Sequence, residues 1–339
     1  MTGQRHSESP DELPDDVPAR LERDVRALSA TPRHRSLPGA LPAARRYCTE
    51  QLQQAGWQVK EHRFTGRPAL RTSDRGKPGS RFPLRWTERL SGVNLVAAPG
   101  RAPQAGDTLV IAHLDTVRPS PGADDNASGV AVALEVARQL RGADHRTVVA
   151  LVDLEEVGHL GAHRLVHALP RPGLVVCLES VGFYDRTPGS QHVPPGFGLL
   201  FPALTRSIRA HQDRGDFVLA VHRRASAGFA QRWAAAARDT GVRPELLRDP
   251  RWSGRGQRFT RWLTPPLLDL DSSDHSPFWR QRVPAVMLTA TAPMRNARYH
   301  RAEDTPDTLD YAAMSALAAS VAASLSSTDP GLRAGTAQP

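Results

Sequence analysis

The chain has 339 residues, 40% of them hydrophobic, which is enough to bury the core of one large α/β domain. Its formal net charge is +9 at pH 7, and almost all of the positive charge is arginine, since Lys60 and Lys77 are the only lysines. The arginines are scattered and form no basic stripe interleaved with aromatic residues. We therefore interpret them as a solvated surface and expect no nucleic-acid partner.

The sequence carries no pattern typical of export, of a disulfide framework or of a membrane span. The N-terminal residues, Met1 to Val17, are polar and acidic and lack the order of a signal peptide. No run of about 18 apolar residues occurs, and Cys48 and Cys177 have no metal-finger or disulfide spacing. We expect a soluble, cytoplasmic protein with no membrane partner.

Hydrophobic periodicity predicts the elements along the chain. A disordered lead, one folded domain and a disordered tail are expected at residues 1–16, 17–327 and 328–339. Helices are predicted over 17–29, 39–55, 127–141, 158–168, 224–240 and 311–325. Strands are predicted at 57–64, at the sheet edge, and at 92–98, 108–112, 147–153, 174–179, 217–222 and 284–290. Surface loops are expected at 65–90, 185–216 and 246–272, the last two long enough to roof a site.

Strands that alternate with helices and are apolar throughout predict a mostly parallel or mixed sheet with helices on both faces. In such folds the sites form where strands give way to loops. Acidic and imidazole side chains gather at those points in this chain: His113, Asp115, Asp124, Asp125, Glu155, Glu156 and Glu179. If folding brings them together, their mutual repulsion requires protons or bound cations, and this mixture of ligands suits zinc, with manganese or cobalt as alternatives.

His113 and Asp115 stand two residues apart at a strand end, so both side chains point to the same side. His113 could bind a metal ion while Asp115 orients the other ring nitrogen. By itself such a pair is as often a plain surface turn. The strand before it and the segment Gly122–Gly129 after it favour a functional role.

Gly122–Gly129 reads Gly-Ala-Asp-Asp-Asn-Ala-Ser-Gly and turns tightly into the predicted helix. A carboxylate there could bridge two metal ions. Capping of the helix by Asp125 or Asn126 is the simpler alternative, but it explains one acidic residue rather than two.

Glu155 and Glu156 follow an apolar strand, and two adjacent carboxylates would be poorly suited to a hydrophobic core. They fit a site in which one binds a cation and the other takes a proton from water, although a solvated pair in a loop is the alternative. Glu179 ends the next apolar strand in the same way. Near the C-terminus His300 is the remaining ligand candidate, and His275 competes with it on residue type alone.

Taken in order, these residues resemble peptidase family M28, the zinc-dependent aminopeptidases that use two metal ions. The matching segments are Ala112–Asp115, Gly122–Gly129, Glu155–Gly158, Glu179, Ser273–Phe278 and Tyr299–Thr305. Each is weak alone, but as an ordered set they are specific. The resemblance implies that 17–327 is a single peptidase domain, a three-layer α/β/α sandwich with a mixed, mostly parallel sheet of about eight strands.

The resemblance also implies roles for individual residues. His113 and Glu179 would bind one zinc ion and Glu156 and His300 the other, with Asp125 bridging both. Glu155 would be the general base. Asp115 would hold His113, and Asp274 would lie near the site. The implied substrate is a peptide or small aminoacyl compound.

Two features leave alternatives open. Family members often carry aspartate where this chain has Glu179, so the affinity at that position can differ. Glutaminyl cyclases of the same superfamily use one zinc ion and cyclise their substrate. A single-zinc acyltransferase and a non-catalytic binding protein on the same fold are therefore the alternatives to an aminopeptidase.

Overall fold

The computed structural model describes residues 16–75, 84–143, 145–251 and 270–326. The expected disordered tail lies outside the described residues, and so does the expected lead apart from Asp16. That residue caps the first helix, because its carboxylate accepts a hydrogen bond from the Ala19 amide at 2.9 Å.

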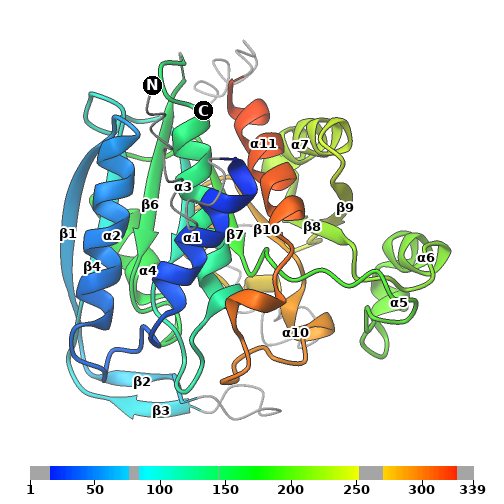
Figure 1. Ribbon diagram of the computed structural model, residues 1–339, viewed down its shortest axis with the longest axis horizontal. Helices are drawn as coiled ribbons and strands as arrows, with labels where there is room; N and C mark the ends of the chain where they lie inside the picture. The colour runs from blue at the N-terminus through cyan, green and yellow to red at the C-terminus, as the bar shows by residue number, and fades with distance from the viewer. Residues whose placement is uncertain (1–15, 76–83, 144, 252–269, 327–339) are drawn as a thin grey trace, which may run out of the picture.

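An eight-stranded mixed sheet forms the centre of the molecule (Figure 1). In spatial order its strands are β1 (Gln58–Gly66), β4 (Leu90–Ala98), β6 (Thr147–Val152), β5 (Thr108–His113), β7 (Leu174–Glu179), β10 (Ala285–Thr289), β8 (Phe217–His222) and β9 (Arg243–Arg248). The β6–β5, β5–β7, β7–β10 and β8–β9 pairs are parallel and the other three antiparallel. The predicted mixed, mostly parallel sheet is confirmed, and β1 lies at its edge as expected.

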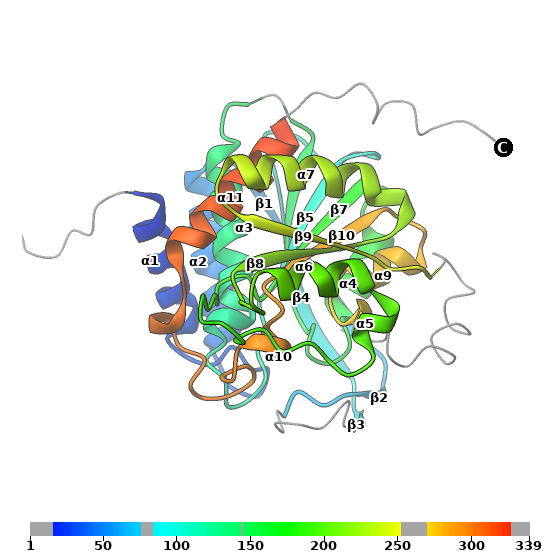
Figure 2. The same cartoon turned by 90° about the vertical axis from the view of Figure 1, so that its right-hand side faces the viewer.

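Helices cover both faces of the sheet, which confirms the predicted sandwich (Figure 2). One layer contains α1 (Val17–Ser29), α2 (Ala40–Gln54), α3 (Gly129–Gln139), α7 (Ala227–Asp239) and α11 (Tyr311–Ser326). The other contains α4 (Leu160–Ala168), α6 (Pro202–Ala210) and α9 (His275–Arg280). Strand β6 shows why both faces are buried: Val149 and Leu151 pack on the first layer, whereas Val148 and Ala150 pack on the second.

All three predicted loops contain some regular structure among their described residues. Within 65–90, β2 (Ala69–Thr72) and β3 (Leu84–Thr87) form a separate two-stranded antiparallel sheet, so the prediction of an irregular loop is wrong there. Its strands have only four residues each and leave Leu70 and Trp86 more than half exposed, so no alternation with a buried face marks them in the sequence.

The stretch 185–216, a loop by its sequence pattern, contains the short α5 (Phe197–Leu200) as well as α6. Leu204 and Ile208 of α6 are four residues apart and pack on the core, which gives that helix its buried side. Strand β9 extends into the predicted loop 246–272, and residues 252–269 of that loop lie outside the described part of the chain. Whether these segments roof the site stays a prediction.

The two cysteines are buried and neither forms a disulfide: Cys48 lies in α2 and Cys177 in β7. Among the described residues, no helix combines the length and apolar character needed to cross a bilayer.

Candidate metal centre

The predicted ligands meet at one edge of the sheet because β5, β6 and β7 run parallel. His113 is the last residue of β5 and pairs with Val152, the last residue of β6. Glu179 is the last residue of β7. The carboxyl ends of these strands, and the loops that follow them, therefore share one edge, as expected for a site in an open α/β sheet.

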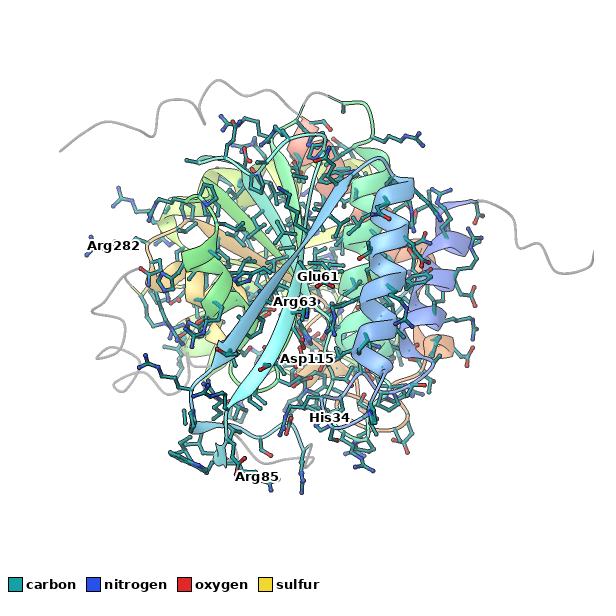
Figure 3. The ribbon with its side chains drawn as sticks, turned by 90° about the vertical axis from the view of Figure 1, so that its left-hand side faces the viewer. His34, Glu61, Arg63, Arg85, Asp115 and Arg282 are labelled. Atoms are coloured by element: carbon teal, nitrogen blue, oxygen red, sulfur yellow. The ribbon has the colours of Figure 1, made fainter. Side chains whose placement is uncertain are left out.

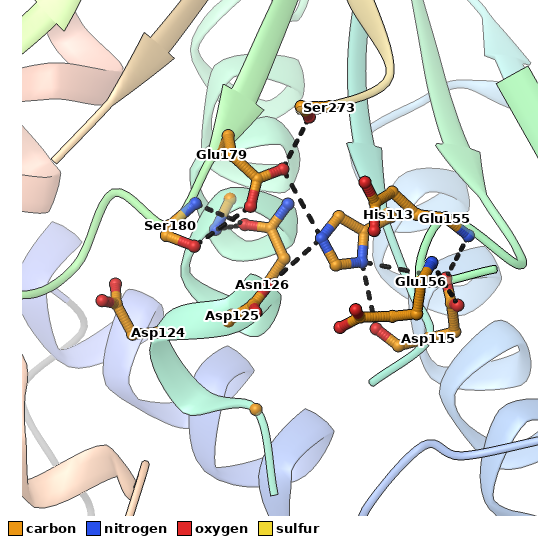
Figure 4. Close-up of polar contacts among 12 residues, drawn as sticks. His113, Asp115, Asp124, Asp125, Asn126, Glu155, Glu156, Glu179, Ser180 and Ser273 are labelled. Atoms are coloured by element: carbon orange, nitrogen blue, oxygen red, sulfur yellow. Dashed lines mark hydrogen bonds and ion pairs between the residues drawn. The ribbon is translucent and has the colours of Figure 1, made fainter. Parts of the chain in front are cut away.

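One group of ligand atoms forms around His113. Its Nε2 atom lies 3.2 Å from Asp125 Oδ1 and 3.5 Å from Glu179 Oε2 (Figure 4). A second group forms around His300, whose Nε2 lies 2.9 Å from Asp125 Oδ2 and 3.7 Å from Glu156 Oε2. The two oxygens of one carboxylate, Asp125, thus face two different imidazoles.

Asp115 acts differently from the sequence expectation. His113 Nδ1 donates to the main-chain carbonyl of Asp115 at 3.0 Å, whereas the Asp115 carboxylate is 3.8 Å away from that nitrogen. The carboxylate instead accepts hydrogen bonds from the amides of Glu155 at 2.9 Å and Glu156 at 3.1 Å. Asp115 therefore holds His113 through its backbone and the Glu155–Glu156 turn through its side chain.

The turn after β6 fixes both glutamates. The amides of Gly158 and His159 donate to the Glu155 carbonyl at 2.8 and 2.7 Å, and Gly158 has a φ of +93°, which suits glycine. Glu156 Oε1 accepts a hydrogen bond from the Val117 amide at 3.2 Å, so its other oxygen is left to face His300.

Side chains that sequence reasoning did not assign complete the surroundings of the ligands. Ser273 Oγ donates to Glu179 Oε2 at 2.6 Å, and Ser180 Oγ lies 3.1 Å from Glu179 Oε1. His159 Nε2 lies 3.1 Å from Glu155 Oε1. Ser273 stood in the quoted Ser273–Phe278 segment and could have been suspected, whereas nothing in the sequence pairs His159 with Glu155.

Asp124 is separate from its neighbour Asp125 and points away from His113 (Figure 4). Its carboxylate accepts hydrogen bonds from the amides of Gly182 and Phe183 at 2.9 and 3.2 Å. It therefore ties the loop after β7 to the Asp125 loop. Asp304 supports the same loop, because its carboxylate accepts from the amides of Asp124 at 2.8 Å and Asp125 at 3.2 Å.

The structure separates the two competing histidines. His275 is buried, and its Nε2 lies 2.8 Å from the carbonyl oxygen of Leu270, so that atom is occupied away from the ligand groups. Asp274 is completely buried, and within the described part of the chain neither of its carboxylate oxygens has a hydrogen-bond partner. Burial, together with the charge of Glu155, raises the pKa of Asp274 well above its usual range.

The concentration of carboxylates perturbs their protonation. Burial raises the pKa of both Glu155 and Glu156 well above the usual range, and neighbouring carboxylates add to the effect. Burial alone would lower the pKa of His113, but the carboxylates of Glu179 and Asp125 outweigh it and raise that pKa. With no cation present the cluster must therefore retain protons.

The donor set fits divalent metal ions. The potential ligand atoms of His113, Asp125 and Glu156 all lie within 4.8 Å of one another. The Nε2 atoms of His113 and His300 are buried and have no properly oriented hydrogen-bond partner among the described residues, although carboxylate oxygens are close to both. Imidazole nitrogen and carboxylate oxygen together are the ligands of zinc hydrolases.

The family model of peptidase family M28 matches residues 94–212 and 259–325, which is more than half of the chain. The chain belongs to peptidase family M28. This M28 protein is also similar to YfbL of Escherichia coli strain K12, with 33% identity over 320 residues that cover 86% of this chain and 88% of YfbL.

Solved structures share the fold of this M28 chain. A zinc aminopeptidase from Bacillus subtilis, BSAP, has a TM-score of 0.62 at 15% identity and covers 93% of this chain and 95% of its own. A glutaminyl cyclase from Fimbriiglobus ruber has a TM-score of 0.58 at 16% identity and covers 96% and 99%. The fold alone therefore does not separate peptidases from cyclases. By its family, this chain is a metallopeptidase of the M28 type.

Proposed function

We propose that this M28 chain is an aminopeptidase that removes N-terminal residues with a pair of zinc ions bridged by Asp125. The observation that carries the proposal is the placement of the Asp125 carboxylate, with one oxygen 3.2 Å from His113 Nε2 and the other 2.9 Å from His300 Nε2. A carboxylate between two imidazoles is what a bridging ligand requires.

Each ion would have its own protein ligands besides the bridge. His113 and Glu179 would hold one ion, and Glu156 and His300 the other, with manganese or cobalt as alternatives to zinc. When bound, the ions would acidify a water molecule and polarise the scissile carbonyl group. The Ser273–Glu179 hydrogen bond at 2.6 Å and the Val117–Glu156 hydrogen bond at 3.2 Å would keep the carboxylate ligands in place.

Glu155 would act as the general base. Its burial raises its pKa, which brings the carboxylate closer to the basicity that proton transfer near neutral pH requires. It would accept a proton from the attacking water and return it to the leaving amine. The Asp115 carboxylate would fix the position of Glu155 at the site, because it accepts a hydrogen bond from the Glu155 amide.

The carboxylates of Asp125, Glu156 and Glu179 lie close to His113 and His300, and two bound zinc ions would offset their negative charge. One ion could then hold the free amino group of a substrate while the other polarises the scissile carbonyl group. Peptides or small aminoacyl compounds are therefore the proposed substrates.

The test combines elemental analysis with a panel of aminoacyl-anilides assayed with and without chelator. We expect two zinc ions per chain, activity that disappears with chelator, and a loss of about 10²–10⁴ in turnover for Glu155→Gln with zinc content unchanged. Glu135→Gln is the matched control, because Glu135 is also buried but lies in the middle of α3, where it pairs with Arg20 of α1. Wild-type turnover in Glu155→Gln would remove Glu155 from the role of base.

A glutaminyl-cyclase-like acyltransferase is the second candidate, favoured by the fold shared with the F. ruber enzyme. It predicts one zinc ion per chain and cyclisation of peptides that begin with glutamine. A binding protein on the same fold predicts neither reaction, so the same substrate panel separates all three.

A further inference from the structure

Arg33 connects the N-terminal part of the chain to the metal centre. It lies between α1 and α2, about 60 residues before the start of the family match at residue 94, and it is only 1% exposed. Its main-chain carbonyl accepts a hydrogen bond from the Thr116 amide at 3.3 Å. Figure 3 shows the next residue, His34, in the same region of the molecule as Asp115.

The Arg33 guanidinium group donates to four main-chain carbonyls. Nε donates to Leu114 at 2.6 Å, and Nη1 donates to Leu28 at 2.6 Å and to Pro121 at 3.0 Å. Nη2 donates to Gly122 at 2.9 Å. One side chain thus joins the end of α1 to both ends of the segment 114–122.

That segment separates two of the proposed ligands. Leu114 directly follows His113, and Gly122 precedes Asp125 by three residues. By holding both ends of the segment at once, Arg33 fixes the spacing between the loop that presents His113 and the loop that presents Asp125. Since a bridging carboxylate works only at a defined distance from the imidazole, this spacing decides how well the two bind the same ion.

The packing around Gly122 leaves little freedom for this arrangement to change. A Cβ atom at Gly122 would lie 2.3 Å from the Asp125 carbonyl oxygen and 3.1 Å from Arg33 Nη2. The Asp125 carbonyl oxygen therefore lies too close to Gly122 to admit a side chain at that position, and the Arg33 guanidinium group also lies close to it.

Arg33 also remains charged within the protein. Burial lowers its pKa to about 10, while the carboxylates of Asp304, Asp125 and Asp115 favour the charged form. Lysine can carry the same charge but lacks the planar fork that reaches four carbonyls from one position. A lysine substitution therefore separates the charge of Arg33 from its geometry.

We propose that Arg33 is a positioning residue of the metal centre, which sets the distance between His113 and Asp125 by bonding the carbonyls of Leu114 and Gly122. The proposal rests on the assignment of His113 and Asp125 as ligands in the preceding section. It extends the working site to a segment that lies outside the family match.

The test compares Arg33→Lys and Arg33→Met with the control Arg138→Met. Arg138 also joins buried elements, since it bonds Asp24 of α1 and Gln51 of α2, but it stands near the end of α3 remote from the site. Three quantities are measured for each protein: the zinc dissociation constant by chelator competition, kcat and KM on an aminoacyl-anilide, and Tm without metal. His113→Ala serves as the reference for loss of a ligand.

We expect both Arg33 variants to weaken zinc binding by about 10–100-fold and to lower kcat more than they change KM. Arg138→Met should lower Tm without changing the zinc dissociation constant. The proposal is overturned if Arg33→Lys binds zinc as the wild type does, if the zinc affinity of Arg138→Met falls as much, or if neither Arg33 variant folds while Arg138→Met does. Unchanged zinc binding in His113→Ala would instead refute the ligand assignment itself.

Discussion

The carboxylate of Asp115 accepts a hydrogen bond of 2.9 Å from the backbone amide of Glu155. Through it the loop after β5, which follows His113, is tied to the turn after β6, which carries the proposed base. The same carboxylate holds the Glu156 amide at 3.1 Å, so one buried side chain sets the position of two acidic residues. A carboxylate offers one acceptor oxygen to each of the two amides, whereas an asparagine side chain has only one acceptor oxygen.

Asp115→Asn should therefore lower kcat by about 10–100-fold while KM and zinc content change little, because one of the two amides then faces an NH₂ group. Steady-state kinetics and elemental analysis measure this. Asp107→Asn is the control: Asp107 is equally buried, but it lies before the opposite end of β5, where it pairs with Arg101. Equal kcat in Asp115→Asn and wild type would contradict the proposed role.

Asp125 and Asp124 form a second matched pair, because they are adjacent and both buried. Asp125→Asn should bind fewer zinc ions per chain and lose most activity, since the bridging carboxylate is gone. Asp124→Asn should keep its zinc content, because its carboxylate oxygens bond the amides of Gly182 and Phe183 and the side chain of Asn296. Equal zinc contents in the two variants would show that neither residue bridges the ions.

Ser273 is expected to affect the ion held by Glu179. Ser273→Ala removes the 2.6 Å hydrogen bond to Glu179 Oε2, which should weaken one zinc site by about tenfold or more. Chelator competition, followed by zinc content, measures the loss. Ser276→Ala is the control, since Ser276 is also buried and its hydroxyl has no hydrogen-bond partner among the described residues. A similar effect in both variants would indicate a general packing defect.

Asp74 should control stability in acid. Burial by itself would raise its pKa, but contacts with His34 and Arg35 outweigh burial and lower the pKa from its usual value of 3.8 to about 2. Because the folded-state pKa is the lower one, the ionised carboxylate stabilises the protein above about pH 4, and this contribution is lost as the pH falls from 4 towards 2. At neutral pH it amounts to about 2 kcal/mol.

Urea unfolding of metal-free Asp74→Asn should therefore show a lower unfolding free energy than wild type at pH 7, and the difference should narrow by pH 3. Asp307→Asn, which removes an exposed ion pair with Arg26, should cause no measurable change at either pH. A difference for Asp74→Asn that is independent of pH would assign the effect to packing rather than to charge.

Local patterns in the sequence were sufficient for seven of the eight strands of the central sheet, with β9 missed, and for the position of the candidate site. Apolar strands such as 147–152 are visible because their burial on both faces leaves an unbroken hydrophobic run, and parallel pairing then places their carboxyl ends together. The same patterns missed β2 and β3, since short exposed strands have no buried face to show. They also missed α6, because the prolines and glycines that precede this helix in the sequence are typical of a loop.

The features of the candidate site that the sequence could not predict depend on contacts between residues far apart in the chain. Residue type could not distinguish His275 from His300, and only the contact of His275 with the Leu270 carbonyl removes it from the ligand groups. The carboxylate of Asp115 was expected on His113, but it bonds two amides some 40 residues away in sequence. No sequence motif marks Arg33. An arginine that donates hydrogen bonds to main-chain carbonyls requires no particular side chain in its partner residues.

The burial of Cys48 and Cys177 gives this enzyme a built-in reporter of unfolding. Burial raises the pKa of both thiols, so the native protein presents no reactive thiolate to an alkylating reagent. Only molecules that have opened can be labelled, and the mass of the chain then rises in discrete steps. Brief alkylation followed by mass spectrometry would thus count opened molecules in any variant described above, without an added dye or tag.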